Sequence, residues 1–220
     1  FTSNISVEDA EELAKNLKIE HQVLPIEDIY NSFYSSLEKE FTNKEPDITE
    51  ENLQSRCRGV LLMALSNKSG DLVLTTGNKS ETAVGYSTLY GDTAGGFAVL
   101  KDVPKILVYR LAEYRNTLSK VIPQRIIDRP PTAELSEDQK DSDSLPEYDV
   151  LDKIIEMYVE QDESKATIIE RGFSKDTVER VIRLIDLSEY KRRQAPLGVK
   201  ITARSFGKDR RYPITNKFFK

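Results

Sequence analysis

The sequence contains one cysteine, Cys57, and one histidine, His21, among its 220 residues. A single cysteine cannot form an internal disulfide, which is typical of proteins in a reducing compartment. A lone histidine offers no partner for a metal site or for a catalytic triad. We therefore interpret Cys57 as a core residue and His21 as a structural residue of a strand.

Long apolar runs are also absent, because no stretch approaches the roughly 18 apolar residues of a membrane-spanning helix. The first residues, "FTSNISVEDAEELAKNL", include neither the basic nor the apolar region of a signal peptide, and they do not begin with methionine. We therefore expect a cytoplasmic protein that does not bind membranes, and a chain that begins partway through a longer polypeptide.

Charge is uneven along the chain. Residues 190–220 hold ten of the 32 Lys and Arg residues but only one of the 37 acidic residues, Asp209. A basic segment of this kind can bind nucleic acid or a phosphate-bearing small ligand, or it can dock onto an acidic face of its own chain. The acidic remainder would repel a polyanion, which disfavours nucleic acid as a partner.

What the sequence does contain is an alternation of helical and strand patterns. Apolar stripes predict one helix that begins at Ser6, capped by Ser6 with Asp9, and further helices from Ile26 and from Thr49. "HQVLPI" (21–26) is a short predicted strand. In the helix capped by Thr49, the side chains predicted to face inward are Leu53, Cys57, Val60, Leu61, Ala64 and Leu65.

The pattern continues downstream. "LVLT" (72–75) is a continuous apolar run, typical of a strand buried in a parallel sheet. A helix capped by Ser80 follows it, another begins at Asp102 and Pro104, and two or three helices are predicted between 148 and 190. Short strands alternating with helices predict an α/β fold with a mostly parallel sheet covered by helices.

Residues 129–146, "RPPTAELSEDQKDSDSLP", show no sustained period. For residues 136–146 the acidic, polar composition predicts a flexible, solvated loop. The preceding "RPPTAEL" fixes the hydroxyl of Thr132 behind two prolines, and a loop of this length in a compact domain is often a lid.

The segment "TTGNKSETAVGYSTLYGD" (75–92) concentrates small polar groups at the end of a predicted strand. In open α/β sheets ligands bind beyond the carboxyl ends of the strands, and a helix start offers free N–H groups that suit phosphate. Thr76 can supply a hydroxyl there, and Glu81 can bind the Mg²⁺ that accompanies a nucleotide phosphate. An ordinary strand–turn–helix with Ser80 as its cap explains the same residues equally well.

The same segment, extended to "TTGNKSETAVGYSTLYGDTAGGFAVLKDVPK", closely resembles the synthetase domain of glutamine-dependent NAD synthetases. So do "ENLQSRCRGVLLMALSN", "RPPTAEL", "LPEYDVLD" and "EYKRRQAPLGVKITARSFGKDRRYPIT". The resemblance runs from about Val7 to Thr215. It implies the doubly wound sheet of the adenine-nucleotide α-hydrolases, and an ATP-dependent amidation of deamido-NAD to NAD.

The resemblance also implies partners and site residues. Ammonia would come from glutamine through an upstream glutaminase domain of the same longer chain, and the family is typically homo-oligomeric. ATP-binding roles are implied for Thr76, Lys105 and Thr132, and a Mg²⁺-binding role for Glu81. Roles in binding deamido-NAD are implied for Asn52, Arg56, Glu81, Tyr86, Ser87, Thr88, Leu89, Tyr190 and Lys191. Judged without the resemblance, Lys105 is a solvated lysine, since a cation is not favoured at a helix start, and Arg56 is an exposed helix residue.

The chain departs from the family pattern in one major respect. The pyrophosphate-binding loop Ser-Gly-Gly-x-Asp-Ser is not found in these 220 residues, and neither is a glutaminase domain with its cysteine nucleophile. We therefore expect a C-terminal portion of a longer enzyme that is inactive by itself. A non-catalytic nucleotide-binding or regulatory remnant of the same fold remains an alternative. A different ATP-pyrophosphatase is disfavoured by "YGDTAGG" and by "KRRQAP".

Overall fold

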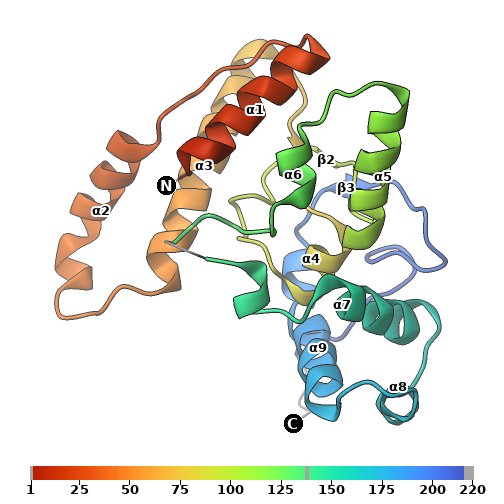
Figure 1. The fold of residues 1–220 in the computed structure, drawn as a ribbon. Coiled ribbons are helices and arrows are strands. Elements are labelled where there is room, and N and C mark those ends of the chain that lie inside the picture. Colours follow the sequence, from red (N-terminus) through yellow and green to blue (C-terminus); the bar gives the residue numbers. More distant parts are fainter. Residues whose placement is uncertain (1, 137–138, 216–220) are drawn as a thin grey trace.

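Three short parallel strands connect distant parts of the chain in this computed structural model, which describes residues 2–136 and 139–215 (Figure 1). Their order is β1 (Leu74–Thr75), β2 (Phe97–Ala98) and β3 (Leu197–Gly198), with Leu74 beside Phe97 and Phe97 beside Leu197. Helices make up most of the remaining structure. The predicted α/β class with a parallel sheet is confirmed, although each strand is only two residues long.

The first three helices are α1 (Asn4–Leu17), α2 (Glu27–Phe41) and α3 (Ile48–Ser69). Ser3 caps α1 by accepting from the backbone N–H of Ser6, and Asp47 caps α3 together with Glu50 in a capping box. The predicted caps Ser6 and Thr49 are therefore wrong. A cap needs an extended backbone just before the helix, and both of these residues already lie in the first turn.

The strand predicted at residues 21–26 is also wrong, because this stretch has no regular structure and His21 is exposed there. Val23 and Leu24 are exposed as well, while Ile26 is buried. A strand is stable only when its N–H and C=O groups pair with a neighbour. Within the part of the chain that the structure describes, the sheet ends at β1 and β3, and neither pairs with this stretch.

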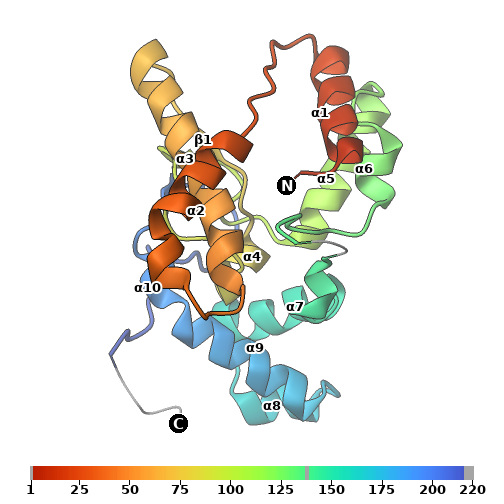
Figure 2. The same ribbon diagram turned by 90° about the vertical axis from the view of Figure 1, so that its left-hand side faces the viewer.

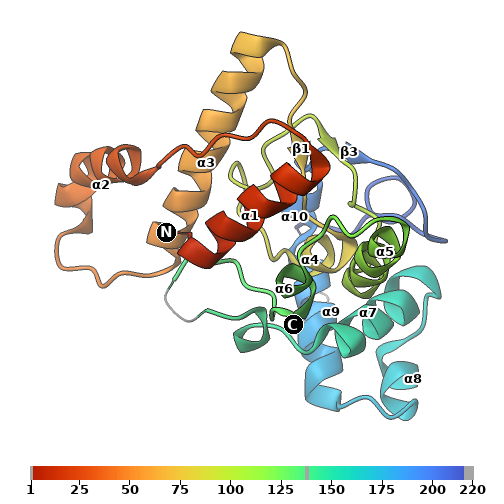
Figure 3. The same ribbon diagram turned by 45° about the horizontal axis from the view of Figure 1, so that its top comes forward.

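Helix α3 is buried on a different side from the one its apolar stripe predicts. Its buried residues are Gln54, Ser55, Cys57 and Gly59, whereas Val60 and Leu65 are 57% and 46% exposed. Of the predicted inward set, only Cys57 is fully buried. The C-terminal end of α3 projects beyond the other elements, and α2 lies apart from them beside α3 (Figure 3). The apolar stripe therefore faces solvent where no other described element covers it.

The strand predicted at "LVLT" exists, but only as Leu74–Thr75, and Leu72 and Leu74 are exposed rather than buried. Helix α4 (Lys79–Val84) follows and is capped by Asn78 rather than by Ser80. The Asn78 side chain accepts from the N–H of Glu81, and the Glu81 carboxylate accepts from the N–H of Asn78. This reciprocal pair fixes the start of the helix.

The remaining helices include those that form the main core. They are α5 (Lys105–Leu118), α6 (Gln124–Asp128), α7 (Tyr148–Ile155), which continues as a π-helical turn (Glu156–Glu160), α8 (Lys165–Glu170), α9 (Lys175–Leu187) and α10 (Glu189–Arg192). The predicted helices between 148 and 190 are thus confirmed. Figure 2 shows α7, α8 and α9 grouped at the end opposite α1. Their fully buried side chains include Leu151, Ile154, Val159, Ile168, Val178, Val181 and Ile185.

Parts of the loop predicted at residues 136–146 and of the basic C-terminal segment pack onto this core. Residues 137–138 lie outside the described residues, and the flexibility predicted for residues 136–146 stays a prediction. Nevertheless, Asp141–Asp143 forms a 3-10 turn, and Asp141 and Leu145 are buried. In the basic segment, the rings of Phe206 and Tyr212 join the core.

No helix within residues 2–136 and 139–215 is both long enough and apolar enough to cross a membrane.

Candidate functional site

Lys105 and Glu81 meet at the beginnings of two helices. Lys105 is the first residue of α5, and its ammonium lies 3.2 Å from a carboxylate oxygen of Glu81. Because a cation is disfavoured at a helix start, Lys105 needs a compensating group. Glu81 supplies the charge, and the ring of Tyr148, with its centroid 5.3 Å from the ammonium, adds a cation–π contact.

Ser80 and Asp152 fix the backbone from which Lys105 extends. The Ser80 hydroxyl accepts from the N–H of Lys105 at 2.8 Å and donates to Asp152, whose other oxygen accepts from the N–H of Ile106 at 2.9 Å. Burial raises the pKa of the Asp152 carboxyl, although these hydrogen bonds act in the opposite direction. Two N–H groups at the start of α5 are thus satisfied by side chains, which fixes the direction of Lys105.

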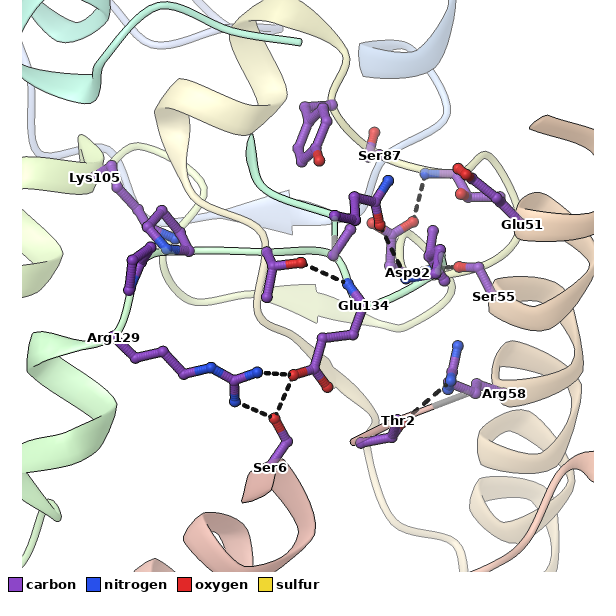
Figure 4. Close-up of a pocket in the computed structure, with 18 of the residues that line it drawn as sticks. Thr2, Ser6, Glu51, Ser55, Arg58, Ser87, Asp92, Lys105, Arg129 and Glu134 are labelled. Carbon is purple, nitrogen blue, oxygen red and sulfur yellow. Dashed lines mark hydrogen bonds and ion pairs between the residues drawn. The ribbon is translucent and has the colours of Figure 1, made fainter. Parts of the chain in front are cut away.

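A cavity of about 800 Å³ opens in front of Lys105 (Figure 4). Its walls come from α1, α3, the 85–92 segment, α5 and the "RPPTAEL" loop. A cavity of this volume is large enough to enclose a drug-sized ligand. Seven residues with predicted binding roles line it: Asn52, Tyr86, Ser87, Thr88, Lys105, Thr132 and Lys191.

Lys191 also faces a second, smaller cavity of about 40 Å³, which Glu81 lines as well. The Lys191 ammonium donates to the carbonyls of Gly85 at 2.8 Å and Ser87 at 2.6 Å. Burial lowers the pKa of this lysine, while the nearby Asp92 carboxylate acts to raise it. Asp92 is open to the cavity yet surrounded by protein atoms, so desolvation raises its own pKa.

Contacts from α3 hold the 87–92 segment in place. The Thr88 hydroxyl donates to the Asn52 side chain at 2.8 Å, and the Ser55 hydroxyl accepts from the N–H of Asp92 at 3.0 Å. At Gly59, an added Cβ would lie 3.0 Å from the carbonyl oxygens of Tyr90 and Gly91, so α3 approaches this turn closely. Asn52 is therefore held at the cavity by packing of α3 against the turn.

Four residues with predicted roles lie elsewhere. Thr76, Arg56, Leu89 and Tyr190 line neither cavity. Thr76 is exposed, and it is its neighbour Thr75 that lines the smaller cavity. The guanidinium of Arg56 donates to the carbonyl of Leu89 at 3.2 Å, on the surface. The binding roles of these four residues stay predictions.

The sequence reasoning missed an ion pair on the cavity wall, between Arg129 and Glu134 (Figure 4). The Ser6 hydroxyl donates to Glu134 at 2.6 Å and accepts from Arg129 at 2.7 Å, which ties α1 to the "RPPTAEL" loop. Burial acts to raise the pKa of Glu134, but the bonds from Ser6, Ser3 and Arg129 outweigh it, so the pKa is lowered. The opposite charges that flank Thr132 in the sequence were a usable signal for this pair.

Thr132 itself has a local role in this loop. Its hydroxyl accepts from the N–H of Glu134 at 3.1 Å, and Glu134 has a left-handed backbone with φ of 49°. Such a conformation is costly for a residue with a side chain. The bonds to Thr132 and to the Ser6–Arg129 cluster hold the loop in this shape beside the cavity.

Comparisons with known proteins found relatives that match nearly the whole chain. A profile of the NAD synthase family matches residues 1–195. The glutamine-dependent NAD(+) synthetase of Acinetobacter baylyi is 59% identical over 98% of this chain, but only 40% of that relative is covered. The chain thus spans about 40% of the length of the curated relatives it matches.

Solved structures show the same relationship. A glutamine-dependent NAD+ synthetase from Acinetobacter baumannii in complex with ADP superposes with a TM-score of 0.58 at 55% identity, covering 97% of this chain and 38% of that one. The NMN synthetase of Francisella tularensis superposes with a TM-score of 0.72 at 26% identity, covering 86% of this chain and 71% of that one. These neighbours confirm the expected fold of the adenine-nucleotide α-hydrolases, and the profile match together with identities above 50% shows that the chain belongs to the NAD synthase family.

Proposed function

We propose that the full-length protein containing these residues catalyses the ATP-dependent amidation of deamido-NAD to NAD, with ammonia derived from glutamine. The observation that carries the proposal is the 59% identity to a glutamine-dependent NAD(+) synthetase over 98% of this chain. The cavity beside Lys105 and Lys191 supports it, because two cations at one cavity suit a substrate rich in phosphate.

The chemistry requires activation of a poor acyl donor. A carboxylate oxygen on the pyridine ring attacks the α-phosphorus of ATP, pyrophosphate leaves, and a mixed anhydride with AMP forms. Ammonia then attacks the carbonyl carbon, and AMP leaves as the amide forms and a proton is released. Such a reaction needs cations on the phosphates and exact positioning more than it needs a protein nucleophile.

On the ATP side, we assign phosphate contacts to Lys105 and hydroxyl contacts to Thr76 and Thr132. Lys105 is suited to this role because its side chain is only 17% exposed and its backbone is fixed by Ser80. A charged donor that is already ordered loses little entropy when phosphate binds.

Glu81 is the residue that would bind Mg²⁺. One of its oxygens is paired with Lys105 and the other accepts from the N–H of Asn78. Mg²⁺ in nucleotide sites is typically held by one or two carboxylates together with phosphate oxygens and waters, so a single carboxylate fits this ion. When bound, Mg²⁺ would neutralise negative charge that develops on the phosphates.

On the dinucleotide side, we propose that Lys191 pairs with a phosphate or with the ring carboxylate. The Tyr86 ring and the 87–89 segment would pack against the dinucleotide, and Asn52 would donate or accept a hydrogen bond. Lys191 is anchored by α10, and its ammonium lies at the edge of both cavities. We also assign contacts with deamido-NAD to Arg56, Glu81 and Tyr190.

The proposed partners follow from the family. A glutaminase domain in the remainder of the full-length protein would supply ammonia, the protein would be a homo-oligomer, and it would act in the cytoplasm. The lengths of the relatives leave room for such a domain, since this chain covers about 40% of each.

The test is formation of NAD by the purified full-length protein, given deamido-NAD, Mg²⁺ and ATP with either glutamine or ammonium chloride. We expect NAD with both nitrogen sources, and none from a polypeptide of these 220 residues, which lack the glycine-rich loop that cradles phosphates. Binding of ATP without NAD formation would instead favour the non-catalytic alternative. Turnover by the 220 residues would contradict the expected dependence on that loop.

A further inference from the structure

Lys79 is a buried lysine whose charge the proposed reaction does not use. Its side chain is 1% exposed, and its ammonium lies 2.7 Å from Glu160 and 3.1 Å from Asp102. It also donates to the Thr202 hydroxyl and to the carbonyl of Arg204. None of its side-chain partners lines either cavity, so the cluster does not touch a ligand there.

The same cluster binds the C-terminal segment. One oxygen of Asp102 accepts from the backbone N–H groups of Ile201 and Thr202, both at 2.8 Å. The Thr202 hydroxyl donates to Asp102 while it accepts from Lys79. Four separate parts of the chain therefore meet at one ammonium: the start of α4, the turn before α5, the end of the π-helical turn and residues 201–204.

Stability alone is a poor reason for such a cluster. Removing charged groups from water is costly, and a buried ion pair can often be replaced by apolar residues without loss of stability. Lys79 is in addition the first residue of α4, where a positive charge is disfavoured. What the cluster provides is a fixed geometry, because each of its hydrogen bonds has a defined direction.

That geometry acts on the residues of the proposed nucleotide site. Lys79 directly follows the cap Asn78 and precedes Glu81 by two residues. Its own N–H donates to the carbonyl of Val103 at 2.9 Å, which joins the start of α4 to the turn that leads into Lys105. The Ser80 hydroxyl makes a second connection between the starts of α4 and α5, because it accepts from the N–H of Lys105 and donates to Asp152.

We propose that Lys79 is a positioning residue, through which residues 201–204 hold the start of α4 so that Glu81 and Lys105 face the nucleotide together. This inference rests on the proposed function for the identity of the nucleotide. It assigns to the C-terminal segment a role in ATP binding, beyond the role of Lys191 at the dinucleotide.

The experiment measures binding rather than turnover. In the full-length protein, the dissociation constants of the Mg²⁺ complex of α,β-methylene-ATP and of deamido-NAD are determined by calorimetry for Lys79→Met, Lys79→Arg and Thr202→Val. Thr202→Val removes one hydroxyl while it keeps the volume, so it tests the inference even if Lys79→Met fails to fold. The matched controls are Lys165→Met, in an exposed ion pair with Glu179, and Thr167→Val on α8.

We expect Lys79→Met to weaken binding of the ATP analogue about tenfold or more, because it removes the buried charge. Thr202→Val should weaken it about fivefold, because it removes only a neutral partner of that charge. Lys79→Arg should recover part of the loss. The affinity for deamido-NAD should change less than about twofold, and the controls should bind both ligands as the wild type does.

Two results overturn the inference. One is unchanged affinity for the analogue in folded Thr202→Val and Lys79→Met proteins. The other is an equal loss for both ligands, which would mean that the cluster only supports the fold. A wild-type protein that binds the analogue but forms no NAD would refute the proposed reaction while the binding ratios still decide the role of Lys79.

Discussion

The ammonium of Lys105 and the carboxylate of Glu81 lie 3.2 Å apart, although 24 residues separate them in the sequence. Each side chain lies in the first turn of a helix, and side-chain hydrogen bonds fix that turn. The pair is about four-fifths buried, so the two charges interact more strongly than they would at the surface. An incoming phosphate would therefore meet a cation and a carboxylate, proposed here to bind Mg²⁺, that are already ordered.

Replacing Lys105 with Met should raise the KM for ATP about tenfold to a hundredfold in the full-length protein. The reason is the loss of a charge-assisted hydrogen bond to phosphate, which is worth about 1.5–3 kcal/mol. Steady-state kinetics with ATP as the varied substrate measure it, and Lys120→Met, which removes an exposed lysine, is the control. An unchanged KM for ATP would show that Lys105 does not contact the nucleotide.

The sequence predicted the helices and the polar segment after β1 because their signals are local. Apolar stripes at helical spacing identified α1, α2, α3 and α9, and these depend on residues close in the chain. The helix caps were wrongly predicted at Ser6, Thr49 and Ser80, because the local sequence pattern does not identify the capping residue. Several adjacent polar residues could cap each helix, and only the backbone geometry selects Ser3, Asp47 and Asn78.

The sites of burial were harder to predict because they depend on distant partners. The apolar stripe of α3 predicted an inward face, but of that face only Cys57 is fully buried, and the polar residues Gln54 and Ser55 are buried beside it. Likewise, nothing local to Glu134 indicates that Ser6 on α1 would reach it. Within the site, the family resemblance suggested that Asn52 and Lys191 bind the ligand. By contrast, only the buried contacts around α4 show that Lys79 and Asp152 hold the starts of the helices.

Truncating Ile185 on α9 should destabilise the fold. Ile185 is fully buried in the main core, so Ile185→Ala should cost about 2–5 kcal/mol through lost burial and a residual cavity. Leu187, two residues later on the same helix, is 60% exposed, and Leu187→Ala is the matched control. Thermal unfolding should show a drop of roughly 5 °C or more for Ile185→Ala only, given about 2–4 °C per kcal/mol for a domain of this size. Equal drops for both variants would contradict this placement of the core.

Glu134 is bonded to Ser3, Ser6 and Arg129, and these contacts should make the attachment of α1 to the "RPPTAEL" loop sensitive to acid. Because the pKa of Glu134 is lower in the folded state than in the unfolded state, its contribution to stability is present above its ordinary pKa of about 4.5 and is lost as the pH falls through the lowered value. We expect Glu134→Gln to have a lower Tm than the wild type at pH 6, and the difference to shrink towards zero as the pH falls below about 4. Calorimetric scans across this range measure it. A difference in Tm that does not vary with pH would mean that the charge of Glu134 does not hold the loop.

Lys191 should act at the dinucleotide, and its contacts suggest how. Its ammonium holds the carbonyls of Gly85 and Ser87, which precede Thr88 at the cavity, so loss of the side chain should disturb the segment and remove a cation together. We expect Lys191→Met to raise the KM for deamido-NAD about tenfold, in line with a charged hydrogen bond, and to affect the KM for ATP much less. Arg193→Met is the matched control, because it removes a nearby positive charge whose partner Glu189 keeps its second ion pair with Arg192. If the basic segment served only as a general source of positive charge, both variants would weaken dinucleotide binding equally. A selective effect of Lys191→Met would instead mean that the anchored position of this lysine, rather than the net charge of the segment, determines recognition.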